Sequence, residues 1–285
     1  MKTITQLRKL TVLLPLLVSC ASGPSHKVVN SQSLNGLSYE LAGAGSWVVF
    51  IHGTNLDRRM WNSEKEWLQE DFLVLTYDLR GQGRSVFPSV KYSNHNDLVE
   101  LLSGLGAQNV TLVGLSAGAQ VALDVALAEP VLVERMVLVS PSIAGYVPEE
   151  MPAFLSELMG FLREKDFDQA NEVLLSSSIM SVPPEQVERV REMVEVNDRL
   201  WSIPYSLVEQ SPVSALERLE EIKMPTLVLV GENDLEAIRT QGALLENRMP
   251  NAHKISIAGG GHLLNLTSPQ LFREALAKFL KISRE

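Results

Sequence analysis

Short apolar runs alternate along this chain with longer segments of helical periodicity, and this alternation constrains the fold more than any other feature. Most runs are unbroken apolar stretches, which are typical of strands buried on both faces. Strands separated by helices predict a parallel sheet covered on both sides, the α/β class. The expected strands are residues 37–41, 47–51, 72–77, 110–113, 136–139, 226–230 and 254–257, and the expected helices are 59–70, 96–105, 117–128, 235–248 and 269–281.

The alternation is interrupted once, over residues 142–223. This stretch has helical patterning and repeated prolines but no convincing strand, so it predicts a helical insertion between two strands. We therefore expect a core made of residues 34–141 and 224–285, with the insertion as a separate helical part.

The composition excludes several kinds of protein. With 45% hydrophobic and 21% charged residues, the chain of 285 residues is globular. The net charge of −9 argues against nucleic acid as a partner, because phosphate binding needs a basic surface. Five histidines and one cysteine, without a CxxC or HExxH motif, leave little from which to build a metal site, and none is expected.

The first residues have the pattern of an export signal. Lys2, Arg8 and Lys9 precede an uncharged apolar run over residues 10–18, and small residues follow around Cys20. The run is much shorter than the about 20 apolar residues that span a bilayer. This favours a secretory signal over the alternative, a transmembrane anchor.

The sequence LVSC at residues 17–20 resembles the lipobox of bacterial lipoproteins, in which the cysteine is lipidated and the chain is cut just before it. The resemblance implies a signal peptide over residues 1–19 and a lipid on Cys20. The segment up to residue 33 is rich in small polar residues and is expected to be a tether, so that residues 20–33 form the anchor. The expected location is the bacterial cell envelope, on the outer membrane or the outer face of the cytoplasmic membrane.

The strongest chemical signal is the pentapeptide GLSAG at residues 114–118, which directly follows an expected strand and precedes an expected helix. A serine on so tight a turn has a strained backbone and an exposed hydroxyl at a helix N-terminus. Gly114 and Gly118 must lack side chains so that the strand and the helix can approach. The pattern matches a nucleophile elbow at Ser116; the alternative is a serine that caps an ordinary helix.

With this motif, the chain resembles the α/β-hydrolase family over most of its length. The resemblance implies a mostly parallel eight-stranded sheet flanked by helices, with a helical lid at residues 142–223. His-Gly-Thr at residues 52–54 is similar to the family's oxyanion loop, which makes the backbone N–H groups of Thr54 and Ala117 the expected oxyanion donors. The run DLRGQGRS at residues 78–85 looks like the family's DxRGxGxS loop, whose expected role is structural.

A serine nucleophile needs a base, and the base needs a carboxylate that orients it. His262 follows three glycines after the last expected strand, where the family keeps its base. Asp234 lies in the loop after the strand at residues 226–230, where the family places its acid, with Glu232 as the local alternative. The remaining histidines discussed, His52, His95 and His253, are expected to be structural, loop or surface residues.

Together these residues predict a serine hydrolase of carboxylic esters or related acyl compounds such as lactones and thioesters. His262 deprotonates Ser116, which attacks the carbonyl of a small acyl substrate, and no cofactor is expected. Cofactor-free haloperoxidases and carbon–carbon bond hydrolases of the same family stay open, whereas a serine in place of aspartate argues against a haloalkane dehalogenase. A non-catalytic binding or scaffolding lipoprotein is the alternative from another class.

Overall fold

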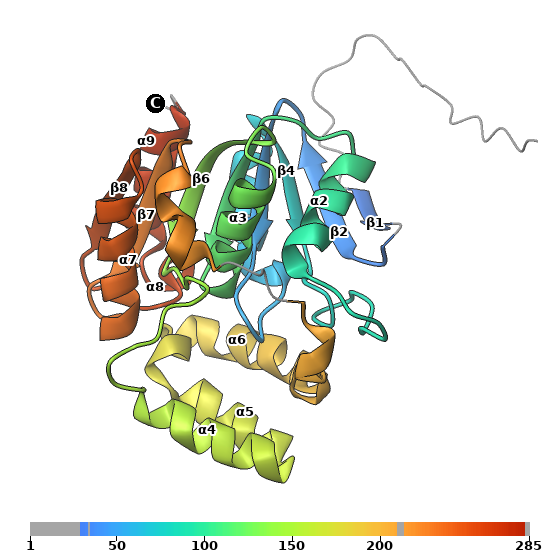
Figure 1. Ribbon diagram of the computed structural model, residues 1–285, viewed down its shortest axis with the longest axis vertical. Coiled ribbons are helices and arrows are strands. Elements are labelled where there is room, and N and C mark those ends of the chain that lie inside the picture. The colour runs from blue at the N-terminus through green and yellow to red at the C-terminus, as the bar shows by residue number, and fades with distance from the viewer. Residues whose placement is uncertain (1–28, 34, 210–213, 283–285) are drawn as a thin grey trace, which may run out of the picture.

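The computed structural model describes residues 29–33, 35–209 and 214–282 (Figure 1). The expected signal peptide, Cys20 and the first part of the tether lie outside the described residues. Residues 29–32, expected as the end of the tether, form strand β1 (Val29–Gln32) instead. The sequence VNSQ has no apolar run, so its pairing with β2 (Ser38–Gly43) was not visible from periodicity.

The strands form one eight-stranded sheet in the order β1-β2-β4-β3-β5-β6-β7-β8. β2 pairs antiparallel with both β1 and β4, and every other pairing is parallel. The expected α/β-hydrolase fold, with a mostly parallel sheet, is therefore confirmed. The remaining strands are β3 (Ser46–Ile51), β4 (Phe72–Tyr77), β5 (Val110–Leu115), β6 (Val133–Val139), β7 (Thr226–Gly231) and β8 (Ala252–Ile257).

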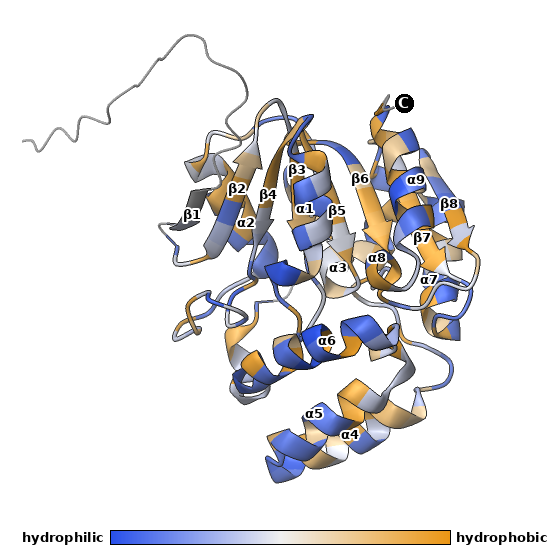
Figure 2. Cartoon of the chain, turned by 180° about the vertical axis from the view of Figure 1, so that it is seen from behind, coloured by the Kyte–Doolittle hydropathy of each residue, from blue (hydrophilic) through white to orange (hydrophobic). Residues whose placement is uncertain are grey.

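Helices cover both faces of the sheet, which explains why its central strands are mostly apolar. All residues of β5 and β7 are buried, and Figure 2 shows the hydrophobic colour along the central strands. One face packs against α2 (Asn94–Gly104), α3 (Ala117–Ala128) and α7 (Glu236–Arg248). The other face packs against α1 (Asn62–Leu68), α8 (Leu264–Thr267) and α9 (Pro269–Leu280).

The insertion at residues 142–223 forms a helical layer beyond the end of the sheet at which the parallel strands terminate (Figure 1). Buried residues of its helices, such as Leu158 and Met193, belong to the same hydrophobic cluster as the α1–α8–α9 face. No helix in the described ranges is long and apolar enough to cross a membrane. The layer contains α4 (Ala153–Glu164), α5 (Phe167–Ser176) and α6 (Pro184–Val196) with the 3-10 helices η2 (Ser178–Met180), η3 (Asp198–Ser202) and η4 (Tyr205–Leu207). The last helix of the expected insertion, η5 (Ala215–Glu221), packs instead against α3 and α7 of the core, because its buried side chains belong to the cluster on that face of the sheet.

Candidate active site

Ser116 lies in the turn that joins β5 to α3. Its φ of 54° and ψ of −114° are rare for a residue with a side chain and cost of order 1–3 kcal/mol. A Cβ on Gly114 would lie 2.3 Å from the carbonyl oxygen of Gly118, and a Cβ on Gly118 would lie 2.3 Å from that of Ile51. The turn therefore requires both glycines, and it presents Ser116 at the N-terminus of α3.

His262 and Asp234 are in direct contact. Nδ1 of His262 lies 3.0 Å from each carboxylate oxygen of Asp234, and the two side chains are only 5% and 0% exposed. The backbone N–H of Leu235 donates to Oδ1 of Asp234 at 2.7 Å and fixes the carboxylate from the other side. Because a carboxylate accepts, the proton belongs on Nδ1, and Nε2 of His262 is left as the nitrogen that can accept another.

This contact exists because the loops after β7 and β8 approach each other very closely. A Cβ on Gly231 would lie 2.3 Å from the carbonyl oxygen of Gly260 and 2.5 Å from that of Gly261. The N–H of Asn233 also donates to the Gly260 carbonyl at 2.9 Å. Parallel neighbouring strands bring both loops to one edge of the sheet, and the glycines let them touch.

Glu232, the alternative acid, lies in the same loop but is exposed. In the part of the chain that the structure describes, no hydrogen bond or ion pair joins its side chain to His262. The structure therefore brings His262 together with Asp234 and not with Glu232.

Ser140 is a residue of this site that the sequence reasoning missed. It directly follows β6, is completely buried and has a φ of 43°. Its Oγ donates to the carbonyl oxygen of His262 at 2.8 Å, so it holds the backbone at the histidine. The only signal in the sequence is a polar residue at the end of an apolar strand, which is the place where site residues gather in α/β folds.

Thr54 lies in a turn that follows β3, which we call the oxyanion turn (residues 53–56). The N–H of Leu56 donates to the carbonyl oxygen of Gly53 at 3.3 Å, and Thr54 is exposed at the tip. Ala117 is the first residue of α3, so its N–H has no acceptor within the helix. Ile51 of β3 pairs with Gly114 of β5. Thr54 lies three residues after Ile51, and Ala117 lies three residues after Gly114.

His52 lies beside the oxyanion turn but is not available as a base. It is completely buried, its Nε2 accepts the N–H of Leu79 at 2.9 Å, and its Nδ1 lies 2.8 Å from the carbonyl oxygen of Gly53. Burial lowers the pKa of His52, which keeps the ring neutral. Of the two other histidines considered, His95 lies 3.0 Å from the hydroxyl of Ser93 in the first turn of α2, and His253 is exposed on β8.

The loop at residues 78–85 has the structural character expected of it. Asp78 accepts the backbone N–H groups of Arg58 and Arg84, each at 2.9 Å, and forms a buried ion pair with the Arg58 side chain. Gly81 and Gly83 have φ values of 78° and 52°. A carboxylate that gathers backbone donors and two glycines in the left-handed region hold a sharp turn behind the site.

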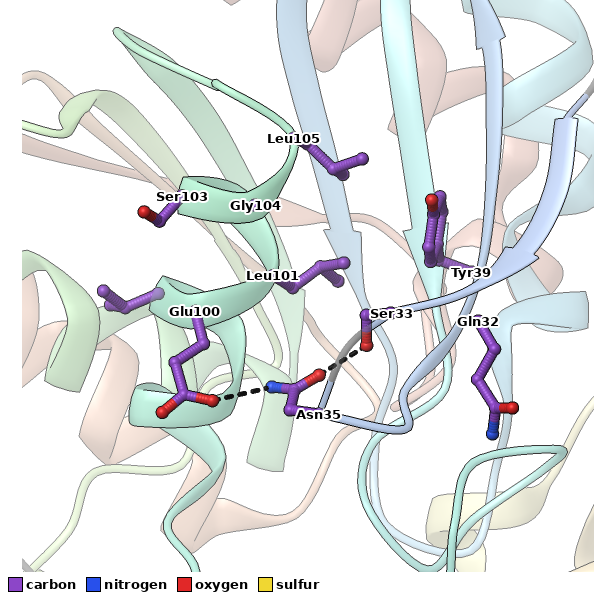
Figure 3. Close-up of a pocket in the computed structure, with 10 residues that line it drawn as sticks. Gln32, Ser33, Asn35, Tyr39, Glu100, Leu101, Ser103, Gly104 and Leu105 are labelled. Atoms are coloured by element: carbon purple, nitrogen blue, oxygen red, sulfur yellow. Dashed lines mark hydrogen bonds between the residues drawn. The ribbon is translucent and has the colours of Figure 1, made fainter. Parts of the chain in front are cut away.

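Two cavities bear on where a substrate could bind. A cavity of about 570 Å³ lies between α2 and the chain around β1 and β2, where Asn35 donates to Glu100 at 3.3 Å (Figure 3). No candidate site residue lines it. In the described ranges, no group of three or more His, Cys, Asp or Glu side chains is placed to hold a metal ion.

The second cavity, of about 510 Å³, lies beside the Ser116 turn. Three of its lining residues adjoin the candidate site. Ser142 donates its N–H to the carbonyl oxygen of Ser116 at 3.3 Å, Leu235 directly follows Asp234, and Gln120 donates its N–H to the same Ser116 oxygen at 3.2 Å. No candidate site residue among those the structure describes lines this cavity itself, but it adjoins the Ser116 turn and the Asp234 loop and is therefore the candidate substrate pocket.

Fold and site together define a hydrolase built on a parallel sheet. A family model described as the alpha/beta hydrolase family matches residues 48–275, and the chain belongs to that family. Over 271 residues it is 30% identical to "Putative carbamate hydrolase RutD" of Caulobacter segnis, an alignment that covers 87% of this chain and 98% of that relative.

Solved structures of hydrolases and of a peroxidase share the fold. A thermophilic esterase from Thermogutta terrifontis superposes with a TM-score of 0.74 at 24% identity, covering 90% of this chain and 98% of the esterase. A bromoperoxidase from Bacillus anthracis superposes with a TM-score of 0.75 at 26% identity, covering 89% of this chain and 100% of the peroxidase. The same architecture thus accompanies more than one enzymatic activity.

Proposed function

We propose that this chain is a serine hydrolase that cleaves carboxylic esters or related acyl compounds through a covalent acyl-enzyme. The observation that carries the proposal is the buried Asp234–His262 pair next to the Ser116 turn. The last residue of β6 and the residue after it connect them: the N–H of Ser116 donates to the carbonyl oxygen of Val139 at 2.9 Å, and Oγ of Ser140 donates to the carbonyl oxygen of His262 at 2.8 Å.

In the proposed mechanism, Nε2 of His262 takes the proton of Ser116 while Oγ attacks the acyl carbonyl carbon. Asp234 holds the imidazole through Nδ1 and stabilises the imidazolium that forms. The N–H groups of Thr54 and Ala117 donate to the oxyanion of the tetrahedral intermediate. His262 then protonates the leaving alcohol, and a water molecule, deprotonated by the same ring, releases the acid from Ser116.

The cavity beside the Ser116 turn supports a neutral substrate. Its described lining residues combine apolar side chains such as Ile143 and Leu155 with polar ones such as Gln120 and Gln241, and include no charged side chain. A charged substrate group would therefore find no counter-ion there. We therefore propose uncharged esters, lactones, thioesters and, because the related RutD protein is named a carbamate hydrolase, neutral carbamates as the substrate class.

The test is to label the purified protein with a fluorophosphonate and to map the modified residue, while measuring turnover of p-nitrophenyl esters of increasing acyl length and of a p-nitrophenyl carbamate. Modification of Ser116 with ester turnover is expected. Folded protein that is neither labelled nor active would contradict the proposal and favour the non-catalytic binding protein.

A cofactor-free haloperoxidase is the second candidate, favoured by the similarity to the Bacillus anthracis bromoperoxidase. Bromination of a dione substrate in acetate, bromide and hydrogen peroxide measures this activity, and its rate is compared with the rate of ester hydrolysis under the same conditions. Bromination that exceeds hydrolysis would exchange the order of the two candidates.

We also propose that the chain is exported and anchored to a membrane of the bacterial cell envelope through a lipid on Cys20. The support is the LVSC sequence after an apolar run, since these residues lie outside the described part of the structure. Cys20→Ala is expected to leave esterase activity intact and to abolish processing or membrane attachment. A variant that is fully processed and remains in the membrane fraction would contradict the anchor.

A further inference from the structure

Asn197 is a buried polar residue of the lid that the proposed mechanism does not use. It follows the last residue of α6 directly and is completely inaccessible to solvent. A buried amide that lacks partners costs about 1–3 kcal/mol, so its hydrogen bonds decide what the residue does. All of its partners are backbone groups, and two of them belong to the core rather than to the lid.

The hydrogen bonds fix the orientation of the Asn197 amide without ambiguity. Its Oδ1 accepts the N–H of Gly83 at 2.6 Å, and its Nδ2 donates to the carbonyl oxygens of Leu56 at 3.1 Å and Met193 at 2.7 Å. Exchanging the amide oxygen and nitrogen would set a donor against the Gly83 donor and an acceptor against two acceptors. Asn197 therefore ties the end of α6 to two separate loops of the core.

One of these loops is the oxyanion turn itself. Leu56 closes the turn around Thr54, and Asn197 holds its carbonyl group. The N–H of Asn55, which has a φ of 58°, is held by Oε1 of Gln82 at 2.9 Å. Since Gln82 directly precedes Gly83, Asn197 contacts both the turn and the loop that grips the turn.

We propose that Asn197 is a positioning residue that sets the direction of the Thr54 N–H, so that the lid supplies part of the oxyanion hole. The proposal rests on the proposed function. An oxyanion donor contributes to catalysis only when it points at the place where negative charge develops. The peptide that carries the Thr54 N–H is fixed through its carbonyl oxygen, that of Gly53, by the N–H of Leu56 and by His52. Leu56, whose carbonyl oxygen Asn197 holds, donates its N–H to this same peptide at 3.3 Å, so a change in the position of Leu56 reaches the Thr54 N–H.

Fastening of the lid alone does not account for this arrangement. Arg199 of the lid donates to the carbonyl oxygens of Gly83 at 3.4 Å and Ser85 at 3.3 Å, and Arg189 of α6 donates to the carbonyl of Arg59. These bonds join the same two layers without contacting residues 53–56. Arg199 is thus a matched control, since it contacts the loop at residues 78–85 but not the oxyanion turn.

The experiment compares Asn197→Asp and Arg199→Ala with the wild-type protein. Asn197→Asp keeps the size and the acceptor for the Gly83 N–H but loses the donor to Leu56. Active sites are counted by fluorophosphonate titration, kcat per titrated site and KM are measured with p-nitrophenyl acetate, and affinity is measured for a trifluoromethyl ketone, whose hemiketal oxyanion needs the same donors.

For Asn197→Asp we expect kcat per titrated site to fall about 10- to 100-fold with little change in KM, because misdirecting one donor costs less than the roughly 10²- to 10³-fold of removing it. The affinity for the trifluoromethyl ketone should fall by a similar factor. A purely structural role would lower the number of titrated sites and leave both quantities unchanged. Arg199→Ala should keep kcat per site close to the wild-type value.

The positioning role is overturned if Asn197→Asp retains wild-type kcat per site and ketone affinity, or if Arg199→Ala loses as much as Asn197→Asp. Should the buried carboxylate prevent folding, Asn197→Ser, which is neutral and smaller, is measured in the same way and judged by the same outcomes. Failure of the proposed function is distinct, because the wild-type protein itself would then show neither labelling nor turnover.

Discussion

The two halves of the candidate site are held in place in different ways. Asp234 and His262, the proposed acid–base pair, come together because Gly231 at the end of β7 lets the glycine loop after β8 approach closely. The oxyanion turn is held instead by two side-chain amides, Gln82 and Asn197, which come from distant segments. The acid–base pair therefore depends on backbone contacts within the core, whereas the oxyanion turn depends on side chains and on the docked lid.

The largest effect is expected where both halves act, at Ser116. Ser116→Ala removes the nucleophile but leaves the N–H of Ala117 and the fold, so kcat should fall by roughly 10⁶-fold while the melting temperature changes little. Hydrolysis of p-nitrophenyl acetate and a thermal melt measure the two quantities. If Ser116→Ala kept an activity close to that of the wild-type protein, another residue would be the nucleophile. The two halves would then not belong to one active site around Ser116.

The next effect tests the acid–base pair alone. Asp234→Asn keeps the shape of the side chain but favours the wrong tautomer of His262, so kcat should fall by about 10⁴-fold. Glu232→Gln is the matched control in the same loop and should keep wild-type kcat, because Glu232 is exposed. The reverse ranking of the two variants, from initial rates at saturating ester, would assign the acid to Glu232.

The same contrast explains what the sequence can predict. Ser116, Asp234 and His262 can each be found because they follow apolar strands within short glycine-containing segments, and strand ends meet at one edge of a parallel sheet. The same periodicity predicts seven of the strands and the parallel core of the sheet, but not the antiparallel direction of β2. Strand β1 does not, because its pairing partner and not its own polar sequence makes it a strand.

The contacts of the oxyanion turn are beyond sequence reasoning for a physical reason. Gln82 lies 27 positions from its partner Asn55, and Asn197 lies 141 positions from Leu56. A single amide in a helical insertion looks like any polar surface residue until the packing of the lid buries it. Periodicity finds buried faces, but it does not find which polar group on one segment meets which backbone group on another.

A third prediction tests whether the acid–base pair depends on backbone contact. Gly231→Ala places a methyl group 2.3 Å from the Gly260 carbonyl oxygen, so the two loops must separate. We expect a loss of about 4 kcal/mol in the free energy of unfolding, measured by urea denaturation, together with loss of activity.

Gly160→Ala in α4 is the control, because nothing lies within 4 Å of its added Cβ. It should raise stability by about 0.5–1 kcal/mol. Equal changes in the free energy of unfolding for Gly231→Ala and Gly160→Ala would contradict the close contact between Gly231 and the loop after β8.

A buried contact links the segments that follow the two halves in the chain. Asn265, in α8 after His262, donates to the carbonyl of Met60 at 2.9 Å and to the Glu64 carboxylate at 3.3 Å. Met60 and Glu64 belong to η1 (Arg58–Trp61) and α1, which follow the oxyanion turn. Arg273 of α9 lies 3.8 Å from the other Glu64 oxygen. Burial raises the pKa of Glu64 from 4.5 to about 7, despite these partners.

The smallest predicted effect follows from this carboxyl group. The folded protein keeps the Glu64 proton up to about pH 7, whereas the unfolded chain releases it near pH 4.5, so folding binds a proton between these values. The free energy of unfolding should therefore fall as pH rises across this range, by about 3 kcal/mol in total, since each pH unit between the two pKa values is worth about 1.4 kcal/mol.

Glu64→Gln removes this pH dependence of the free energy of unfolding, and Glu66→Gln, at an exposed position of the same helix, keeps it. Urea denaturation of the three proteins at pH 5 and pH 8 measures the difference. If the free energy of unfolding falls equally from pH 5 to pH 8 in the wild-type protein and in Glu64→Gln, the Glu64 carboxyl group is already ionised in the folded protein. The contact would then be an ion pair between Glu64 and Arg273.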